Sequence, residues 1–193
     1  MNSCIRSVYF PDEWKNALIK PIPKANKNLK DPKNFRPISL LPTLGKILER
    51  AFAKHLTNFL EERNIIQPEQ FGFRRNHSTT HQLMRVVETV HQGFEVGART
   101  ATLLLDIEKA FDRLWIPGLL LKCIKFKLPV WMQIFITDFL HNRKFTVKLN
   151  RAESTEKIPR AGVPQGSVLG PILFNIYMVD LRPPSHTKLA LYT

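Results

Sequence analysis

Leu103-Leu104-Leu105-Asp106-Ile107-Glu108-Lys109-Ala110-Phe111-Asp112 is the stretch of the chain that carries the most structural information. Its three consecutive leucines predict a strand that is buried on both faces, as in a parallel sheet. Asp106 ends this strand, and an ionised carboxylate at the edge of a core needs a cation, hydrogen bonds or water around it. Because active sites often lie just beyond the carboxyl ends of strands, Asp106 is a candidate metal ligand. The alternative is that Asp106 only caps the turn after the strand.

Length and composition indicate one folded domain with a polyanionic partner. The chain has 193 residues, of which 44% are hydrophobic and 23% are charged, as expected for a globular protein with a single core. It carries 29 Lys and Arg against 16 Asp and Glu, a net charge of +13. This excess favours a nucleic acid or an anionic membrane surface as partner, and the sign alone does not choose between them.

Basic residues are concentrated near the amino terminus. Leu18, Ile19 and Ile22 alternate there with lysines and prolines, which predicts an irregular or edge strand in a basic hairpin that ends near Arg36. The hairpin is either a nucleic-acid contact or simply a solvated face. Between residues 15 and 36 the single acid, Asp31, stands against seven basic residues: Lys15, Lys20, Lys24, Lys27, Lys30, Lys33 and Arg36.

Cysteine, histidine and hydropathy patterns argue against several other classes of protein. Cys4 and Cys123 are the two cysteines, too few for a disulfide framework and typical of a reducing compartment. We expect Cys123 to be a small core residue. His77 and His81 lack the glutamate and the cysteines of common zinc sites. The first 14 residues contain no apolar run, and the apolar stretch 168–179 is too short and too broken to span a bilayer.

Hydrophobic spacing predicts five helices. Thr79 and Gln82 form a capping box for the second of them, and Ile134, Phe135 and Phe139 should point inward from the fourth. The helices are expected over 44–62, over 80–94, from Pro117, from Pro129 and over 167–181.

Alternating patterns predict strands between these helices. Phe145, Val147 and Leu149 alternate with polar residues, and a turn after them would form a hairpin with residues 153–158. Residues 188–192 begin an apolar strand. Helices and strands mix without regular βαβ alternation, which indicates the α+β class.

Four segments lie in an order and spacing that resemble one known family. The chain is similar to the reverse transcriptase domain of non-LTR (LINE-type) retrotransposons, above all the jockey-like elements of insects. The resemblance extends from about Trp14 to Tyr192. The segments are 34–41 (NFRPISLL), 70–74 (QFGFR) followed by 77–80 (HSTT), 105–112 (LDIEKAFD) and 162–171 (GVPQGSVLGP).

The resemblance implies a right-hand polymerase fold, of which residues 1–193 would form one partial domain with fingers, an incomplete palm and no thumb. Residues 14–98 and 116–150 would be fingers-like, and residues 99–115 and 151–193 palm-like. The implied reaction is RNA-directed DNA synthesis by template-directed nucleotidyl transfer. Its implied partners are an RNA template, a DNA primer and deoxynucleoside triphosphates. The resemblance implies no membrane, and a protein partner cannot be inferred from it.

The implied cofactor is a pair of Mg²⁺ ions. Two divalent cations about 3.5–4 Å apart stabilise the attacking and the leaving oxygen of a phosphoryl transfer, and Mg²⁺ prefers hard oxygen ligands. By the resemblance, Asp106 is the catalytic, metal-binding carboxylate, and the backbone carbonyl of Ile107 is a further ligand.

The resemblance also implies a nucleotide site. Phe111 would be a steric gate that excludes a ribose 2′-hydroxyl, the alternative being an ordinary core aromatic. Arg36 would hold the triphosphate through paired hydrogen bonds, together with Lys24, for which Lys20 or Lys27 are alternatives. Gln165 would lie against the incoming nucleotide and the template base. The full set is Lys24, Arg36, Ala110, Phe111, Gln165 and Gly166.

Other polar residues of these motifs are expected to be structural. Ser167 should be a helix N-cap, and Asp112 and Asp180 should make structural hydrogen bonds. RNA-dependent RNA polymerases also pair two acids over a similar interval. Phe111, where those enzymes need a small residue, and the loop around Gln165 argue against that class.

The family's pair of adjacent aspartates does not occur before the sequence ends at Leu191-Tyr192-Thr193. We therefore expect a truncated domain that is not a competent polymerase as given, since one carboxylate cannot hold two Mg²⁺ ions. A non-catalytic nucleic-acid-binding remnant is the alternative function. We expect an intracellular protein, with nucleus and cytoplasm both open.

Overall fold

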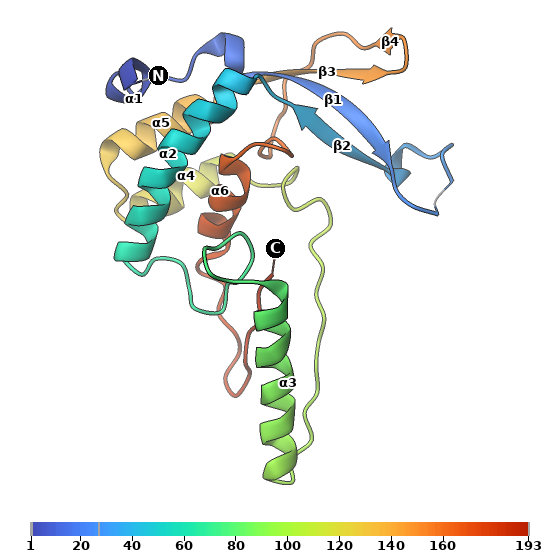
Figure 1. Ribbon diagram of the computed structural model, residues 1–193, viewed down its shortest axis with the longest axis vertical. Coiled ribbons are helices and arrows are strands. Elements are labelled where there is room, and N and C mark those ends of the chain that lie inside the picture. Colours follow the sequence, from blue (N-terminus) through green and yellow to red (C-terminus); the bar gives the residue numbers. More distant parts are fainter. Residues whose placement is uncertain (1, 27, 193) are drawn as a thin grey trace.

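The computed structural model describes residues 2–26 and 28–192. Helices and strands are mixed in these ranges (Figure 1). In chain order the elements are α1 (Asn2–Arg6), η1 (Asp12–Trp14), β1 (Asn16–Pro23), η2 (Pro32–Asn34), β2 (Phe35–Leu40), α2 (Thr43–Glu62), α3 (Thr79–Glu95), α4 (Ile116–Lys125), α5 (Val130–Leu140), β3 (Lys144–Leu149), β4 (Ala152–Glu153) and α6 (Leu169–Met178).

The strands form one mixed sheet in the order β2-β1-β3-β4. β1 pairs antiparallel with β2 and parallel with β3, and β3 turns back antiparallel onto β4. The predicted basic hairpin is confirmed, with Ile22 opposite Arg36 and Ile19 opposite Ser39. The predicted hairpin after Leu149 is confirmed as well, since Phe145 bridges to Lys157 beyond β4. The fold is therefore mixed α and β, as the sequence indicated.

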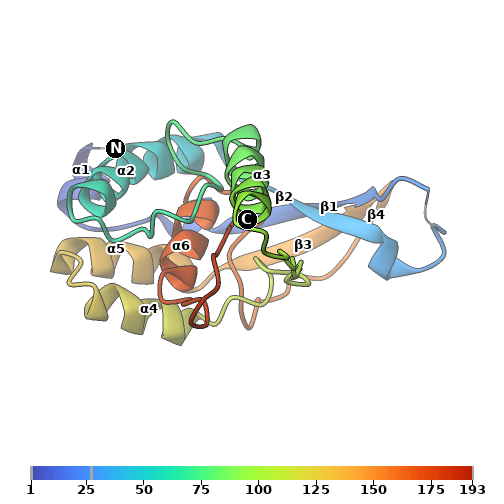
Figure 2. The same ribbon diagram turned by 90° about the horizontal axis from the view of Figure 1, so that it is seen from below.

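The core lies between α2, α4, α5 and α6, which gather on one side of the molecule while the sheet extends away from them (Figures 1 and 2). Phe52 of α2 stacks on Phe135 of α5 with ring centroids 4.1 Å apart. Phe10 packs edge-on against Phe139 at 5.2 Å. Cys123 is fully buried among them, as expected. Large buried rings of this kind supply most of the hydrophobic stabilisation of a small core.

Helix positions agree closely with the hydrophobic spacing, and the differences are local. The cap of α3 is Ser78, whose hydroxyl accepts from the N–H of His81, rather than Thr79. In α5 Phe135 and Phe139 are buried as predicted, but Ile136 is buried in place of the predicted Ile134, which is half exposed. The last helix covers Leu169–Met178, less than the predicted 167–181. These differences shift helix ends and faces without changing the order of elements.

The predicted strand over 103–105 is wrong. Residues 101–107 form no strand, and Leu103, Leu104 and Leu105 are 80%, 89% and 83% exposed. A strand that is buried on both faces needs neighbours for its backbone and layers over its side chains. No described strand pairs with this segment, so its leucines remain in solvent. The predicted strand over 188–192 is reduced to one bridge between Leu191 and Gln70.

Helix α3 is the least packed of the long helices. It projects from the helical body, and the chain after it runs back toward α4 (Figure 1). Gln82 is its one buried residue among those described, while Leu83, Val87 and Phe94 are 63%, 59% and 70% exposed. The apolar face that the sequence predicted for this helix is therefore largely uncovered, with only Val86 and Val90 partly buried. None of the described helices combines the length and apolar character needed to cross a bilayer.

Candidate nucleotide site

A short loop, residues 162–166, joins three parts of the molecule. At its start, the N–H of Gly162 donates to the carbonyl of Leu114 at 2.8 Å and that of Val163 to Phe111 at 2.9 Å. Further on, the N–H of Ser39 in β2 donates to the carbonyl of Gln165 at 2.9 Å. The loop therefore links the segment after Asp106 to the basic hairpin before it leads into α6.

Two glycines make this close approach possible. Gly162 and Gly166 have positive φ angles of 90° and 108°, which favour glycine. A Cβ on Gly162 would lie 2.7 Å from the carbonyl oxygens of Phe111 and Asp112, and one on Gly166 would lie 2.9 Å from that of Ser39. Backbone therefore packs on backbone at both ends of the loop.

Gln165 and the neighbourhood of Phe111 are brought together, as the resemblance implied. The Gln165 amide donates to a carboxylate oxygen of Asp112 at 3.1 Å, the structural hydrogen bond that was predicted for Asp112. Burial raises the pKa of Asp112, and the hydrogen bond from Gln165 opposes the rise. Phe111 is half buried, next to half-buried Ala110, and lies 5.3 Å from the ring of Phe174.

Asp106 and Ile107 lie apart from this contact. Both are exposed in the irregular segment that replaces the predicted strand, and Asp106 has no ion pair or hydrogen bond with the described residues. Within residues 2–26 and 28–192 there is also no cluster of three or more His, Cys, Asp or Glu side chains that suits a metal ion. One carboxylate and one carbonyl are too small a donor set for two Mg²⁺ ions, so these residues alone do not form the implied metal site.

The basic hairpin presents Lys24 and Arg36. Arg36 is exposed on β2, three residues before Ser39, and Lys24 donates to the carbonyl of Lys33 at 3.0 Å. Among the described residues, neither side chain forms a hydrogen bond with the loop, and the hairpin is linked to Gln165 through the backbone of β2. Of the two alternatives to Lys24, Lys20 is exposed on β1 and Lys27 lies outside the described residues.

Lys15 does not belong to this basic surface. Its side chain is 1% exposed, and its ammonium lies 2.8 Å from carboxylate oxygens of both Asp12 and Asp138. The sequence analysis counted Lys15 among the basic residues of the hairpin, because the sequence does not reveal that the distant Asp138 is its partner. Lys15 is a structural cation.

Two further expectations concern the start and end of α6. The hydroxyl of Ser167 accepts from the N–H of Gly170 at 2.9 Å, but α6 begins at Leu169, so the N-cap position is Val168 and not the predicted Ser167. Asp180 forms an ion pair with Lys122 at 2.6 Å, in line with its predicted structural role.

The 70–74 motif is held in place by buried amides that sequence reasoning missed. Gln70 donates to Asn175 at 3.0 Å, and Asn175 donates to the carbonyl of Gly72 at 2.9 Å. These bonds fasten the motif to α6. Phe73 then lies edge-on to Phe111, with ring centroids 6.3 Å apart. The sequence feature that could have revealed these bonds is Asn175, an amide side chain in an otherwise apolar helix, because a buried amide needs hydrogen-bond partners.

Glu49 is the second residue that sequence reasoning missed. It is 1% exposed, and one of its oxygens accepts from the N–H groups of Val168 at 2.6 Å and Leu169 at 3.0 Å. Its signal was its helical spacing from Gly45, Phe52 and Leu56, which places a carboxylate on the core face of α2.

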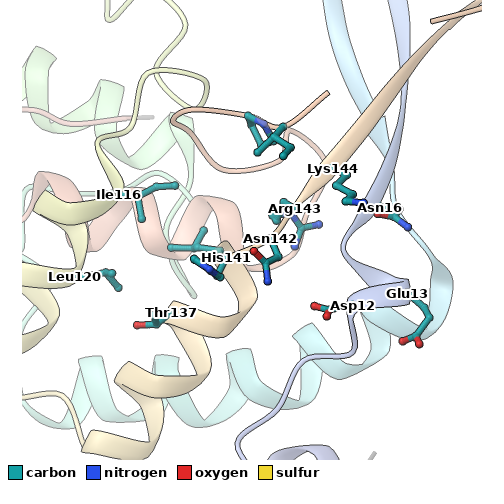
Figure 3. Close-up of a pocket in the computed structure, with 13 residues that line it drawn as sticks. Asp12, Glu13, Asn16, Ile116, Leu120, Thr137, His141, Asn142, Arg143 and Lys144 are labelled. Atoms are coloured by element: carbon teal, nitrogen blue, oxygen red, sulfur yellow. The ribbon is translucent and has the colours of Figure 1, made fainter. Parts of the chain in front are cut away.

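A cavity of about 640 Å³ opens elsewhere, between the start of β1, α4, α5 and β3 (Figure 3). Its lining mixes acids such as Asp12 and Glu13 with the bases His141, Arg143 and Lys144. None of the site residues predicted from the sequence lines it, so the candidate nucleotide site around Phe111 and Gln165 is separate from this cavity.

Comparison with known proteins identifies the family. A family model described as "Reverse transcriptase (RNA-dependent DNA polymerase)" matches residues 22–192. The probable RNA-directed DNA polymerase from transposon X-element of Drosophila melanogaster is 43% identical over 183 residues, 95% of this chain and 20% of that protein. The RNA-directed DNA polymerase from mobile element jockey of the same species is 42% identical over 186 residues, 96% of this chain and 20% of that protein.

A third relative, the probable RNA-directed DNA polymerase from transposon BS, also of Drosophila melanogaster, is 38% identical over 98% of this chain and 21% of its own length. The chain thus spans about a fifth of the relatives it matches. The family model nevertheless covers all four motifs, because it begins at residue 22 and the first motif begins at residue 34. This chain belongs to the reverse transcriptase family.

Proposed function

We propose that this chain provides the fingers and part of the palm of an RNA-directed DNA polymerase. The fingers would comprise residues 14–98 and 116–150, and the palm part residues 99–115 and 151–193. In this proposal the surface around Phe111 and Gln165 receives a deoxynucleoside triphosphate opposite an RNA template, with a DNA primer as acceptor. The names of the relatives, which are RNA-directed DNA polymerases of mobile elements, favour this function.

One observation carries the proposal: the loop 162–166 links Phe111 to β2. Gln165 contacts Asp112 through its side chain and Ser39 through its carbonyl, so residues from three separate motifs meet at one place. Phe111 is backed by Phe174 at 5.3 Å and flanked by Phe73 at 6.3 Å. A ring held on two sides is suited to exclude a 2′-hydroxyl, because it cannot yield without disturbing its neighbours.

The remaining roles are those that the resemblance to the family implies. Arg36 and Lys24 would bind the triphosphate, Gln165 and Gly166 would face the nucleotide and the template base, and Ala110 would lie beside the sugar. Magnesium, when bound, supplies the charge that stabilises the reacting oxygens. Asp106 and the Ile107 carbonyl are the donors that this chain would contribute to it.

A chimaeric polymerase tests the proposal. The 42% identical segment of the jockey polymerase would be replaced by residues 1–193, and incorporation of deoxynucleotides on an RNA template measured in Mg²⁺. We expect template-dependent incorporation. In the chimaera, Phe111→Ala should raise the use of ribonucleotides relative to deoxynucleotides by about tenfold or more.

Phe94→Ala provides the matched control, because Phe94 is an aromatic residue on α3 that is 70% exposed; it should leave that ratio unchanged. The proposal fails if the chimaera melts cooperatively and binds an RNA–DNA hybrid but incorporates no nucleotide. That result would favour the alternative, a nucleic-acid-binding module without catalytic function.

A further inference from the structure

Glu49 makes an unusual contact for a glutamate in the middle of a helix. Its carboxylate accepts two backbone hydrogen bonds, from Val168 at 2.6 Å and from Leu169 at 3.0 Å. Val168 is the N-cap of α6 and Leu169 is its first residue. Amides at the start of a helix have no carbonyl acceptor within the helix. The positive end of the helix dipole favours a negative group at this position. A side chain from α2 therefore satisfies the start of a helix more than 100 residues away in sequence.

The helix start that Glu49 holds is directly continuous with the candidate nucleotide site. Two residues separate Gln165 from Val168. Gly162 and Val163 fix the beginning of the loop on the segment 111–114, and Ser39 bonds to Gln165 near its end. Glu49 thus adds a constraint just beyond the C-terminal end of the loop, and it acts there together with the hydrogen bond from the Gly170 N–H to the Ser167 hydroxyl.

The charges around Glu49 are few and do not compete for its hydrogen bonds. Arg143 lies close enough to favour the ionised carboxylate, but it forms no ion pair with it; its guanidinium donates to the carbonyl of Phe139 at 3.0 Å and lies 4.7 Å from that ring. Lys46, one turn earlier on α2, acts in the same direction. The carboxylate is therefore left to the two amides of α6.

We propose that Glu49 is a positioning residue, whose carboxylate couples α2 to the first turn of α6 and thereby fixes the Gln165 loop beside Phe111. The consequence for nucleotide binding rests on the proposed polymerase function. The coupling itself does not, because it follows from contacts within this chain.

Amide hydrogen exchange of the chain tests the coupling without reference to activity. In Glu49→Ala, exchange at Val168 and Leu169 should accelerate about tenfold or more relative to amides of α5, because those amides lose their acceptor. Glu49→Gln retains an acceptor oxygen of the same reach and should restore slow exchange at both positions. Glu62→Ala, an exposed glutamate on the same helix, is the control and should change neither.

Two results would overturn the coupling: acceleration spread evenly over all amides of Glu49→Ala, or none at Val168 and Leu169. The catalytic consequence is read in the chimaera, where Glu49→Ala should raise the KM for deoxynucleotides several-fold with little change in hybrid affinity, and Glu49→Gln should rescue it. An unchanged KM in an active Glu49→Ala chimaera would refute the positioning role. An inactive parent chimaera would instead refute the proposed function, while the exchange data still decide the coupling.

Discussion

At the scale of single residues, Gly162 occupies a position with no room for a side chain. Its φ is 90°, and an added Cβ would lie 2.7 Å from two backbone carbonyl oxygens. Gly162→Ala should therefore lower the free energy of unfolding by about 2–4 kcal/mol, through the positive φ and through overpacking. Urea unfolding measures this. Gly97→Ala is the control, since Gly97 has φ 67° but open space around it, and it should cost only about 1 kcal/mol.

Glu49 provides a prediction about pH. Burial raises its pKa, while the hydrogen bonds from Leu169 and Val168 and the charges of Arg143 and Lys46 oppose the rise. The folded chain thus holds this proton more tightly than the unfolded chain. The resulting stabilisation is complete below the ordinary carboxyl pKa and is lost as the pH rises through the raised pKa of the folded state.

The difference in unfolding free energy between wild type and Glu49→Gln should therefore fall as the pH increases through that window, measured by urea titrations at successive pH values. Glu62→Gln should run parallel to wild type, because Glu62 is exposed. A Glu49→Gln curve that also runs parallel would show that Glu49 is not perturbed by folding.

At the scale of elements, Lys15 and Asp138 join the start of β1 to α5. Asp138 accepts from the Lys15 ammonium at 2.8 Å and from the N–H of Phe10 at 2.6 Å. Burial lowers the pKa of Lys15, but its hydrogen bonds to Asp12 and Asp138 outweigh this and raise the pKa above its usual value. Lys15 therefore stays charged in the folded state.

Asp138→Ala should cost about 3–5 kcal/mol, because it leaves a buried cation with one exposed partner and a buried N–H without an acceptor. Asp180→Ala is the comparison, because the Asp180 side chain, which pairs with Lys122, is 40% exposed. It should lower the free energy of unfolding by about 1 kcal/mol or less. Thermal and urea unfolding of both variants measure the two losses of stability. An equal decrease in the free energy of unfolding in both would contradict the structural role of Lys15.

The hairpin of β1 and β2 should contribute to nucleic-acid binding through its exposed charges. Replacing Lys20, Lys24 and Arg36 by alanine should make the salt dependence of RNA–DNA hybrid affinity shallower by about two to three in the log–log slope. Fluorescence anisotropy at several salt concentrations measures the slope. The matched control, Lys54, Lys125 and Lys127 to alanine, removes the same charge from helical and loop surfaces. If both triple variants change the slope equally, the hairpin is not the contact.

The elements differ in how far the sequence could predict them. α2, α4 and α5 were predicted well because an amphipathic helix forms its own hydrogen bonds and its spacing marks the buried face. The strand over 103–105 was not, because a strand exists only through a partner that periodicity does not identify. The loop motif around Gln165 was predicted because its residues are consecutive in the sequence. Glu49 contacts the start of α6 from α2, more than 100 residues away, and this contact is visible only in the fold.

At the scale of the whole molecule, two surface properties oppose each other. The net charge of +13 keeps copies of the chain apart. In contrast, Leu103, Leu104 and Leu105 are at least 80% exposed, and Leu83 and Phe94 of α3 are exposed as well. Exposed apolar side chains that gather on a surface promote association. Salt screens the repulsion and leaves the apolar attraction in place, so the two properties can be separated by ionic strength.

We therefore predict that the chain self-associates, and that added salt strengthens this association while it weakens hybrid binding. Replacing Leu103, Leu104 and Leu105 by glutamine should reduce self-association in sedimentation velocity experiments. It should change the unfolding free energy by no more than about 0.5 kcal/mol, because these side chains contact no core.

The control replaces the equally apolar but scattered Leu29, Leu121 and Leu149, which are 58%, 60% and 53% exposed. Because single exposed leucines are common on protein surfaces, this control should leave association unchanged, and an equal effect of both variants would mean that general hydrophobicity, rather than the segment 103–105, drives it.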